Sequence, residues 1–311
     1  MADLILHHYQ GSLFSEKIRA IFGFKGLTWH SVEIPPIMPR PLLMPLTGGY
    51  RRTPVLQVGA DIFCDTHVIT EFLEDLHPQP PLHPDTLGWA VRTLTAHADG
   101  HLFRVVVALC FQPKAAAATL GTLGEDMANR FAADRAELVK GAQGLATLPP
   151  DVAEVELADL LGRFEAQLAV TRWACGGMPS LADFALYHCL WLVQNNPVVH
   201  ELLLPYARTR EWMQRLAGFG HGVRKEMSAD DALAAAREAE PMALEIASGH
   251  LPEGVAQGDT VSVTPTDYGL IPVTGTLDYC TSHACAVLRE DDEAGRVRVH
   301  FPRTGFRIDP A

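Results

Sequence analysis

Two serine hydroxyls stand three residues apart near the start of the chain, in the stretch GSLFSEKIR. Ser12 lies in a turn after the apolar run LILHHY, and Ser15 opens an amphipathic segment that predicts a helix from Ser15 to about Lys25. The N-terminus of a helix carries free backbone N–H groups and a positive dipole end, so it stabilises a thiolate or oxyanion, to which a serine hydroxyl donates one more hydrogen bond. Taken alone, the stretch favours a simpler interpretation, in which both serines only cap the helix.

Two later stretches carry similar chemistry. In RRTPVLQV a proline enters a strand, and such a proline is often cis, which exposes the backbone of Thr53; a trans proline at an edge strand is the alternative. In CDTHVITEFLED, Asp65 and Thr66 precede an apolar periodic segment as an N-cap pair does. An acid there also takes a ligand ammonium while the helix N-terminus takes its carboxylate, which is what an amino-acid headgroup needs.

The elements that must position these residues fall into three regions. Residues 1–84 mix short β-like runs with amphipathic helices, and the proline-rich stretch HPQPPLHP ends this α/β unit. In residues 85–247, apolar side chains recur at spacings of three and four residues, which predicts an all-helical bundle. Residues 248–311 contain period-two runs such as TVSVTP and RVRVHF between turn residues, which predicts a small antiparallel β domain.

The composition limits the class of protein. The 311 residues are 48% hydrophobic and 20% charged, as in an ordinary globular protein. A net charge of −12 argues against nucleic acid or an anionic membrane as the main partner. The six cysteines are scattered, mostly in apolar runs, which indicates a reducing compartment. Because neither a secretory signal nor an apolar stretch of membrane-spanning length is recognisable, we expect a cytoplasmic protein.

Together, GSLFSEKIR, TPVL and CDTHVITEFLEDLHPQPPLHP resemble the thioredoxin-like domain of the glutathione S-transferases, in particular the serine-type, bacterial-like members. In the helical region, GGMPSLADFALYHCLWLV resembles the capping box and buried helix of the family's second domain, with Ser180 and Asp183 at the matching positions. EWMQRLAGFGHG is similar to the family's closing helix. The resemblance covers about residues 3–225, so the C-terminal β region is an addition to it.

The resemblance implies a role for each motif. Ser12 matches the serine or cysteine that hydrogen-bonds the glutathione sulfur, and Thr53, before Pro54, matches the residue whose backbone pairs with the cysteinyl part. Asp65 and Thr66 match the pair that holds the γ-glutamyl end. Arg52 is expected to meet the glycyl carboxylate, with Arg51 as the alternative, because a fork of donors suits a carboxylate.

The sequence departs from the family pattern at Ser15, which is not a cysteine, so a disulfide-reductase cycle through a cysteine pair is not supported. His8 stands roughly where the tyrosine-type classes place their activating Tyr, and Tyr9 is one residue along; both remain alternatives to Ser12. The electrophile is expected to lie against the helical domain. Its candidate contacts are Phe103, Val107, Phe111 and Trp191.

Three further groups carry weaker signals. Cys280, His283 and Cys285 are soft ligands close together, but they lack a fourth ligand and a zinc-knuckle spacing, so no metal is expected. Asp99 and His101 are interpreted as ordinary helical residues. Arg303 and Phe306 in HFPRTGF either pack the β region onto the rest or form a ligand or partner surface, and packing is the default.

The resemblance therefore implies an enzyme that takes glutathione as co-substrate and transfers it to a small electrophile, as a homodimer. Two alternatives stay open. The same thiolate serves glutathione-dependent isomerisation or dehalogenation, and a non-catalytic protein would bind glutathione while the C-terminal β region recruits a partner.

Overall fold

The computed structural model describes the chain except residues 1–2, 85, 122–123, 143–147, 245 and 247. Its N-terminal part is the expected α/β unit, with helix α1 starting earlier than the sequence pattern predicts. Because Ser12 is already the N-cap, Ser15 lies inside the helix. The elements of this part are β1 (Ile5–His8), α1 (Leu13–Phe24), β2 (Thr28–Glu33), α2 (Met44–Thr47), β3 (Val55–Val58), β4 (Asp61–Cys64) and α3 (Thr66–Leu76).

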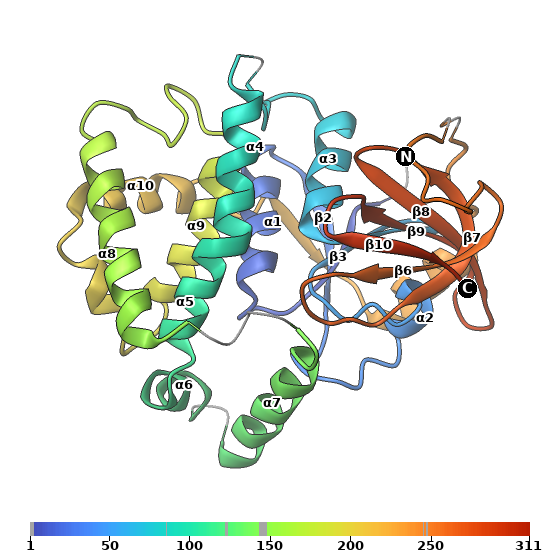
Figure 1. Cartoon of the computed structure of the whole chain (residues 1–311), viewed down its shortest axis with the longest axis horizontal. Coiled ribbons are helices and arrows are strands. Elements are labelled where there is room, and N and C mark those ends of the chain that lie inside the picture. Colours follow the sequence, from blue (N-terminus) through green and yellow to red (C-terminus); the bar gives the residue numbers. More distant parts are fainter. Residues whose placement is uncertain (1–2, 85, 122–123, 143–147, 245, 247) are drawn as a thin grey trace.

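A helical bundle follows, on the left in Figure 1. Its first long helix is interrupted by η1, a single π-helical turn between α4 and α5. The capping box expected from Ser180 and Asp183 is present at the start of α9. The helices are α4 (Gly88–His97), η1 (Ala98–Leu102), α5 (Phe103–Cys110), α6 (Pro113–Leu120), α7 (Glu125–Leu138), α8 (Pro150–Gln167), α9 (Leu181–Gln194), the 3-10 turn η3 (His200–Leu203) and α10 (Ala207–Ala217).

Among the described helices, none alone is long and apolar enough to cross a membrane. One bent pair, residues 88–110 with 113–119, has sufficient length and apolar composition, with an 84° bend between its helices.

The end of the predicted helical region contains a strand that the sequence pattern did not reveal. Strand β5 (Val223–Glu226) returns to the N-terminal sheet and pairs in parallel with β2. Its four residues are all exposed, so they carry no hydrophobic alternation from which a strand is recognised. Helix α11 (Ala229–Arg237) then leads towards the C-terminal β region.

The C-terminal region, which we call the β module (residues 248–311), contains five antiparallel strands as expected. Its strands are β6 (Thr260–Pro265), β7 (Val273–Cys280), β8 (Ala284–Asp291), β9 (Gly295–Pro302) and β10 (Phe306–Pro310). The module does not form a sheet of its own. Strand β9 pairs in parallel with β4, which gives one ten-stranded sheet in the order β10-β6-β7-β8-β9-β4-β3-β1-β2-β5, on the right in Figure 1.

A buried ionic network fastens β4 to β9. Asp61, which is fully buried, accepts hydrogen bonds from Arg298 Nη1 at 3.2 Å and from the backbone N–H of Met242 at 2.7 Å, and its Oδ1 lies 2.7 Å from His300 Nε2. Arg298 also forms an ion pair with Asp278 at 2.7 Å. The carboxylate thus holds groups from β9 and from the segment at Met242, at the point where the module joins the N-terminal sheet.

The sheet separates two hydrophobic cores, one against the helical bundle and one shared between the N-terminal strands and the module. Because β1 lies inside the sheet, both of its faces are buried, and each face carries one histidine. His7 hydrogen-bonds Gln57 at 2.8 Å, and His8 hydrogen-bonds Ser31 at 2.9 Å. Burial lowers the pKa of His7 to about 4 and that of His8 to about 3, so both rings are neutral.

Candidate functional site

Ser12 occupies the N-cap position of α1 and is 3% exposed. Its Oγ accepts a hydrogen bond from the backbone N–H of Ser15 at 3.2 Å, so the cap interpretation of the sequence holds for this residue. The Ser12 hydroxyl donates no hydrogen bond to an acceptor within the described part of the chain. Ser15 is fully buried inside the helix, away from this role.

The Thr53–Pro54 peptide bond is cis, one of the two alternatives that the sequence left open. Sheet pairing of β3 starts only at Val55, which leaves the backbone of Thr53 outside the ladder. The Thr53 hydroxyl accepts a hydrogen bond from Arg40 Nη1 at 2.9 Å. Arg40 is 4% exposed and also donates to the carbonyl oxygens of Pro35, Pro36 and Arg51, so it fixes the loop that presents Thr53.

Asp65 caps α3 from an unusual backbone conformation. Its φ of 93° lies in a region where non-glycine residues are rare. Such strained conformations persist only where the surrounding structure holds them in place, and they cluster at ligand sites. Its Oδ1 accepts the backbone N–H of His67 at 3.0 Å, and its Oδ2 lies 3.8 Å from Arg52. Thr66, one residue on, is buried at the first position of the helix.

These residues meet around one cavity of about 430 Å³. Of the six residues predicted from the sequence, five line it: Arg52, Thr53, Pro54, Asp65 and Thr66. Ser12 is not among the lining residues, although Phe14 and Lys17 of the same helix are. The helical bundle contributes Thr95, Ala96, Asp99 and Gly100, and the β module contributes Asp267, Tyr268, Thr304 and Gly305.

An ion pair that lines this cavity was missed by the sequence interpretation. Lys17, whose side chain is 1% exposed, donates to Asp99 at 2.6 Å and to the Thr66 hydroxyl at 3.3 Å. The other oxygen of Asp99 is buried and has no hydrogen-bond partner among the described residues; it lies 3.7 Å from His188. Burial lowers the pKa of His188 to about 4, so this ring is neutral. Asp99 lies in η1, and no spacing rule reveals a π-helical turn or the α1 lysine that it meets.

Both arginines considered for a ligand carboxylate already bind aspartates of this chain. Arg51 pairs with Asp134 of α7 at 2.6 Å, and both side chains are 9% exposed. Arg52 binds Asp267 of the β module through both terminal nitrogens and also donates to the backbone carbonyl of Tyr268. The Arg52 guanidinium lies 4.0 Å from the centre of the Tyr268 ring. Burial opposes the charge of Arg52, but the surrounding Tyr268, Tyr50, Asp267 and Asp65 raise its pKa.

None of the four residues considered for the electrophile lines the cavity, but Phe103 packs beside two residues that do. Its ring is 5.0 Å from that of Phe14 and 6.3 Å from that of Tyr268, both of which line the cavity. Phe111 stacks on Phe131 at 6.2 Å instead. Val107 and Trp191 do not line the cavity.

The remaining residues considered from the sequence pack against other parts of the fold. His8 is buried between Ser31 and Arg19, and Tyr9 is half-buried against the core shared with the module. Phe306 is buried against Tyr50 and Phe301, in line with the packing role expected for HFPRTGF.

No group of three or more His, Cys, Asp or Glu side chains in the described part of the chain is arranged to hold a metal ion. Cys280 and Cys285 are buried register partners on β7 and β8, and His283 lies in the exposed turn between these strands.

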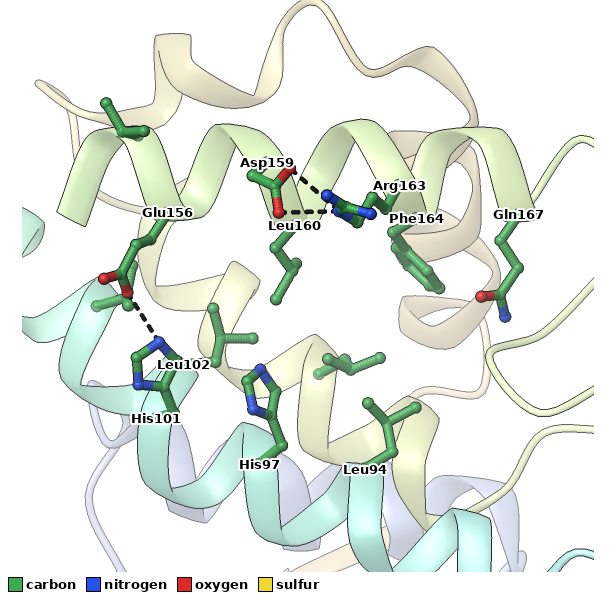
Figure 2. Close-up of a pocket in the computed structure, with 13 residues that line it drawn as sticks. Leu94, His97, His101, Leu102, Glu156, Asp159, Leu160, Arg163, Phe164 and Gln167 are labelled. Atoms are coloured by element: carbon green, nitrogen blue, oxygen red, sulfur yellow. Dashed lines mark hydrogen bonds and ion pairs between the residues drawn. The ribbon is translucent and has the colours of Figure 1, made fainter. Parts of the chain in front are cut away.

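A second cavity, of about 460 Å³, lies between the α4–α5 helix and α8 (Figure 2). His101 pairs with Glu156 at 2.8 Å at one end of it, and Asp159 pairs with Arg163 along α8. None of the sequence-predicted site residues lines this cavity. Five of the six residues predicted from the sequence line the first cavity instead.

Comparisons with known proteins agree with this arrangement. Residues 6–81 match the family model described as glutathione S-transferase, N-terminal domain, and residues 115–215 match that of the C-terminal domain. The crystal structure of a GST-like protein from Pseudomonas syringae is 36% identical, with a TM-score of 0.83 and complete coverage of both chains. This protein therefore belongs to the glutathione S-transferase family.

More distant relatives match only part of the molecule. A glutathione S-transferase structure from Rhodospirillum rubrum F11 is 18% identical, covers 69% of this chain and 87% of its own with a TM-score of 0.51, and supports the fold alone. Glutathione S-transferase U4 of Arabidopsis thaliana is 27% identical over 82 residues, which are 26% of this chain and 37% of the relative. This chain thus spans little more than a third of that curated relative.

Proposed function

We propose that the protein binds glutathione in the first cavity and activates its thiol for attack on a small electrophile. The observation that carries this proposal is the meeting of Thr53 and cis Pro54 with Asp65 and Thr66 around one cavity beside the N-terminus of α1. These are separate segments of the chain, and each supplies a group that a γ-glutamyl thiol peptide needs.

Each group has a defined role in this proposal. The backbone of Thr53 pairs with the cysteinyl part, the Asp65 carboxylate takes the γ-glutamyl ammonium, and Thr66 with the N-terminus of α3 takes its carboxylate. Lys17, which is paired with Asp99, donates a hydrogen bond to the Thr66 hydroxyl at 3.3 Å and so orients it.

Ser12 donates its free hydroxyl hydrogen to the sulfur. A thiol has a pKa of about 8.5 in water, so lowering it by one or two units raises the thiolate fraction several-fold or more at neutral pH. The thiolate sulfur then forms a bond to the electrophilic carbon, and the leaving group departs with its electron pair. No covalent bond to the enzyme is required.

Replacing Ser12 by alanine is expected to lower kcat/KM for thiol transfer by about 100-fold, the usual effect of removing one hydrogen-bond donor from a developing anion. Glutathione affinity should change little, because Ser12 contacts only the sulfur. The measurement is glutathione binding by calorimetry, together with transfer to a panel of electrophiles that includes isomerase and dehalogenase substrates.

Two matched variants separate chemistry from folding. Ser12→Gly removes the hydroxyl but keeps a good N-cap residue, so it should be as inactive as Ser12→Ala with less loss of stability. Ser15→Ala should retain full transfer activity, since Ser15 is buried within α1. Glutathione binding without turnover of any substrate in the wild type would contradict the enzyme proposal and favour the non-catalytic alternative.

Replacing Asp65 by asparagine is expected to weaken glutathione binding about 10-fold, because the ammonium loses its charged partner. Asparagine also caps helices and tolerates positive φ, so α3 should remain intact. An unchanged glutathione affinity in a folded Asp65→Asn variant would mean that the site assignment is wrong.

We also propose, from the family resemblance, that the chain works as a homodimer in the cytoplasm. Sedimentation of the purified protein tests the first point, and fractionation of the source cells tests the second.

A further inference from the structure

The two side chains that join the β module to Arg52 differ in their exposure to solvent. The Arg52 side chain is 11% exposed, whereas Asp267, which binds both of its terminal nitrogens, is 54% exposed. Asp267 can thus return to water at little cost, while Arg52 cannot, because a buried guanidinium needs an acceptor. This ion pair is built so that one carboxylate can be exchanged for another.

The surroundings of Arg52 hold further unused donors. Its Nε and the hydroxyl of Tyr50 are both buried without a hydrogen-bond partner among the described residues. Tyr50 is 2% exposed and lines the same cavity as Arg52. Burial raises the pKa of Tyr50 well above its usual value, so its hydroxyl is a proton donor. Asp267 therefore does not satisfy the donors at this end of the cavity.

The turn that carries Asp267 contacts Arg52 through Tyr268 as well, and it has a second attachment that does not involve Arg52. The backbone N–H of Gly269 donates to the carbonyl of Leu138, at the end of α7, at 2.8 Å. Gly269 has a φ of 58°, and a Cβ there would approach the Leu138 side chain to 3.1 Å, so the turn lies close against this helix. The Asp267 side chain can thus leave Arg52 while the turn stays attached.

We propose that Asp267 is a built-in competitor for Arg52, which a carboxylate of the thiol ligand displaces on binding, so that the β module sets the affinity of the site. This proposal rests on glutathione as the ligand. The ligand carboxylate takes over the hydrogen bonds of Arg52, and Asp267 becomes solvated. The displacement is a binding step only, and no covalent bond changes.

The test compares two ligands with three proteins. Glutathione carries two carboxylates, whereas its diethyl ester keeps the thiol and the ammonium but has none. Binding of each ligand is measured by calorimetry to the wild type, to Asp267→Asn and to Asp309→Asn. Asp309 belongs to the same module and pairs with Arg307, and both of these β10 side chains are exposed.

Asp267→Asn is expected to bind glutathione about 5-fold more tightly than the wild type, because a partly exposed ion pair that must break reduces the competent population by about that factor. Its affinity for the diethyl ester should be unchanged, and Asp309→Asn should behave as the wild type with both ligands.

Unchanged or weaker glutathione binding by Asp267→Asn would overturn the competition and make Asp267 a residue that only positions Arg52. Equal gains for both ligands would also overturn it, since they would indicate a general loosening of the turn. If wild type and variants all fail to bind glutathione, the proposed function itself fails.

Discussion

Replacing Asp61 by alanine is expected to lower the free energy of unfolding by about 3–5 kcal/mol, the usual cost of removing one partner from a buried charged network. The change leaves His300 Nε2 and the Met242 N–H without their acceptor and Arg298 with Asp278 as its remaining carboxylate. Because Asp61 is fully buried, water cannot replace the lost carboxylate. Urea denaturation measures the effect.

A matched control lies in the β module, to which Asp61 binds. Glu290 pairs with Arg296 at 3.7 Å on the β8–β9 hairpin, and their side chains are 77% and 51% exposed. Glu290→Ala should cost less than about 1 kcal/mol, because exposed ion pairs contribute little. Since none of the tryptophans lies in residues 248–311, tryptophan fluorescence reports the rest of the chain, and hydrogen exchange reports the module. Equal stability losses in the two variants would contradict the structural role of Asp61.

Lowering the pH from 7 to 5 is expected to destabilise the protein by several kcal/mol. His7, His8 and His188 are buried as neutral rings, with pKa values lowered by burial from 6.5 to about 4, about 3 and about 4. Between these values and 6.5 the unfolded chain binds protons that the native state does not, so stability rises with pH in this window. The contribution is fully present above pH 6.5 and is lost as the pH falls, by about 1.4 kcal/mol per histidine and pH unit.

The pH dependence of urea denaturation between pH 7 and 5 checks this expectation. A His7→Gln variant, which keeps a polar group beside Gln57, should show a slope smaller by about one proton than the wild type. One buried carboxyl opposes the trend, because burial raises the pKa of Asp183. A stability independent of pH over this range would show that the three histidines do not stay neutral in the native state.

The local parts of the site were readable from the sequence because each depends on a short motif. Ser12, Thr53–Pro54 and Asp65–Thr66 each combine a turn or cap with the start of a regular element, and caps and prolines act on their immediate neighbours. The strands of the β module were recognisable for the same reason, since alternation is a local pattern.

The contacts between residues far apart in the chain could not be predicted from the sequence. Arg52 meets Asp267, and Lys17 meets Asp99, through the packing of segments far apart in the chain. Neither aspartate is distinguished by spacing, and the exposed strand β5 has no apolar pattern. The sequence also separated the β module from the N-terminal unit, because nothing in DIFC indicates that the open edge of β4 pairs with a strand near the C-terminus.

The pairing of β4 with β9 has a consequence for synthesis. While a ribosome makes the chain, β4 emerges more than two hundred residues before its neighbour, so its edge stays open during most of translation. An open edge of apolar residues such as Ile62 and Phe63 attracts other nascent chains, and contacts so distant in sequence form slowly. The nascent chain is therefore expected to depend on chaperones until β9, near the C-terminus, has left the ribosome.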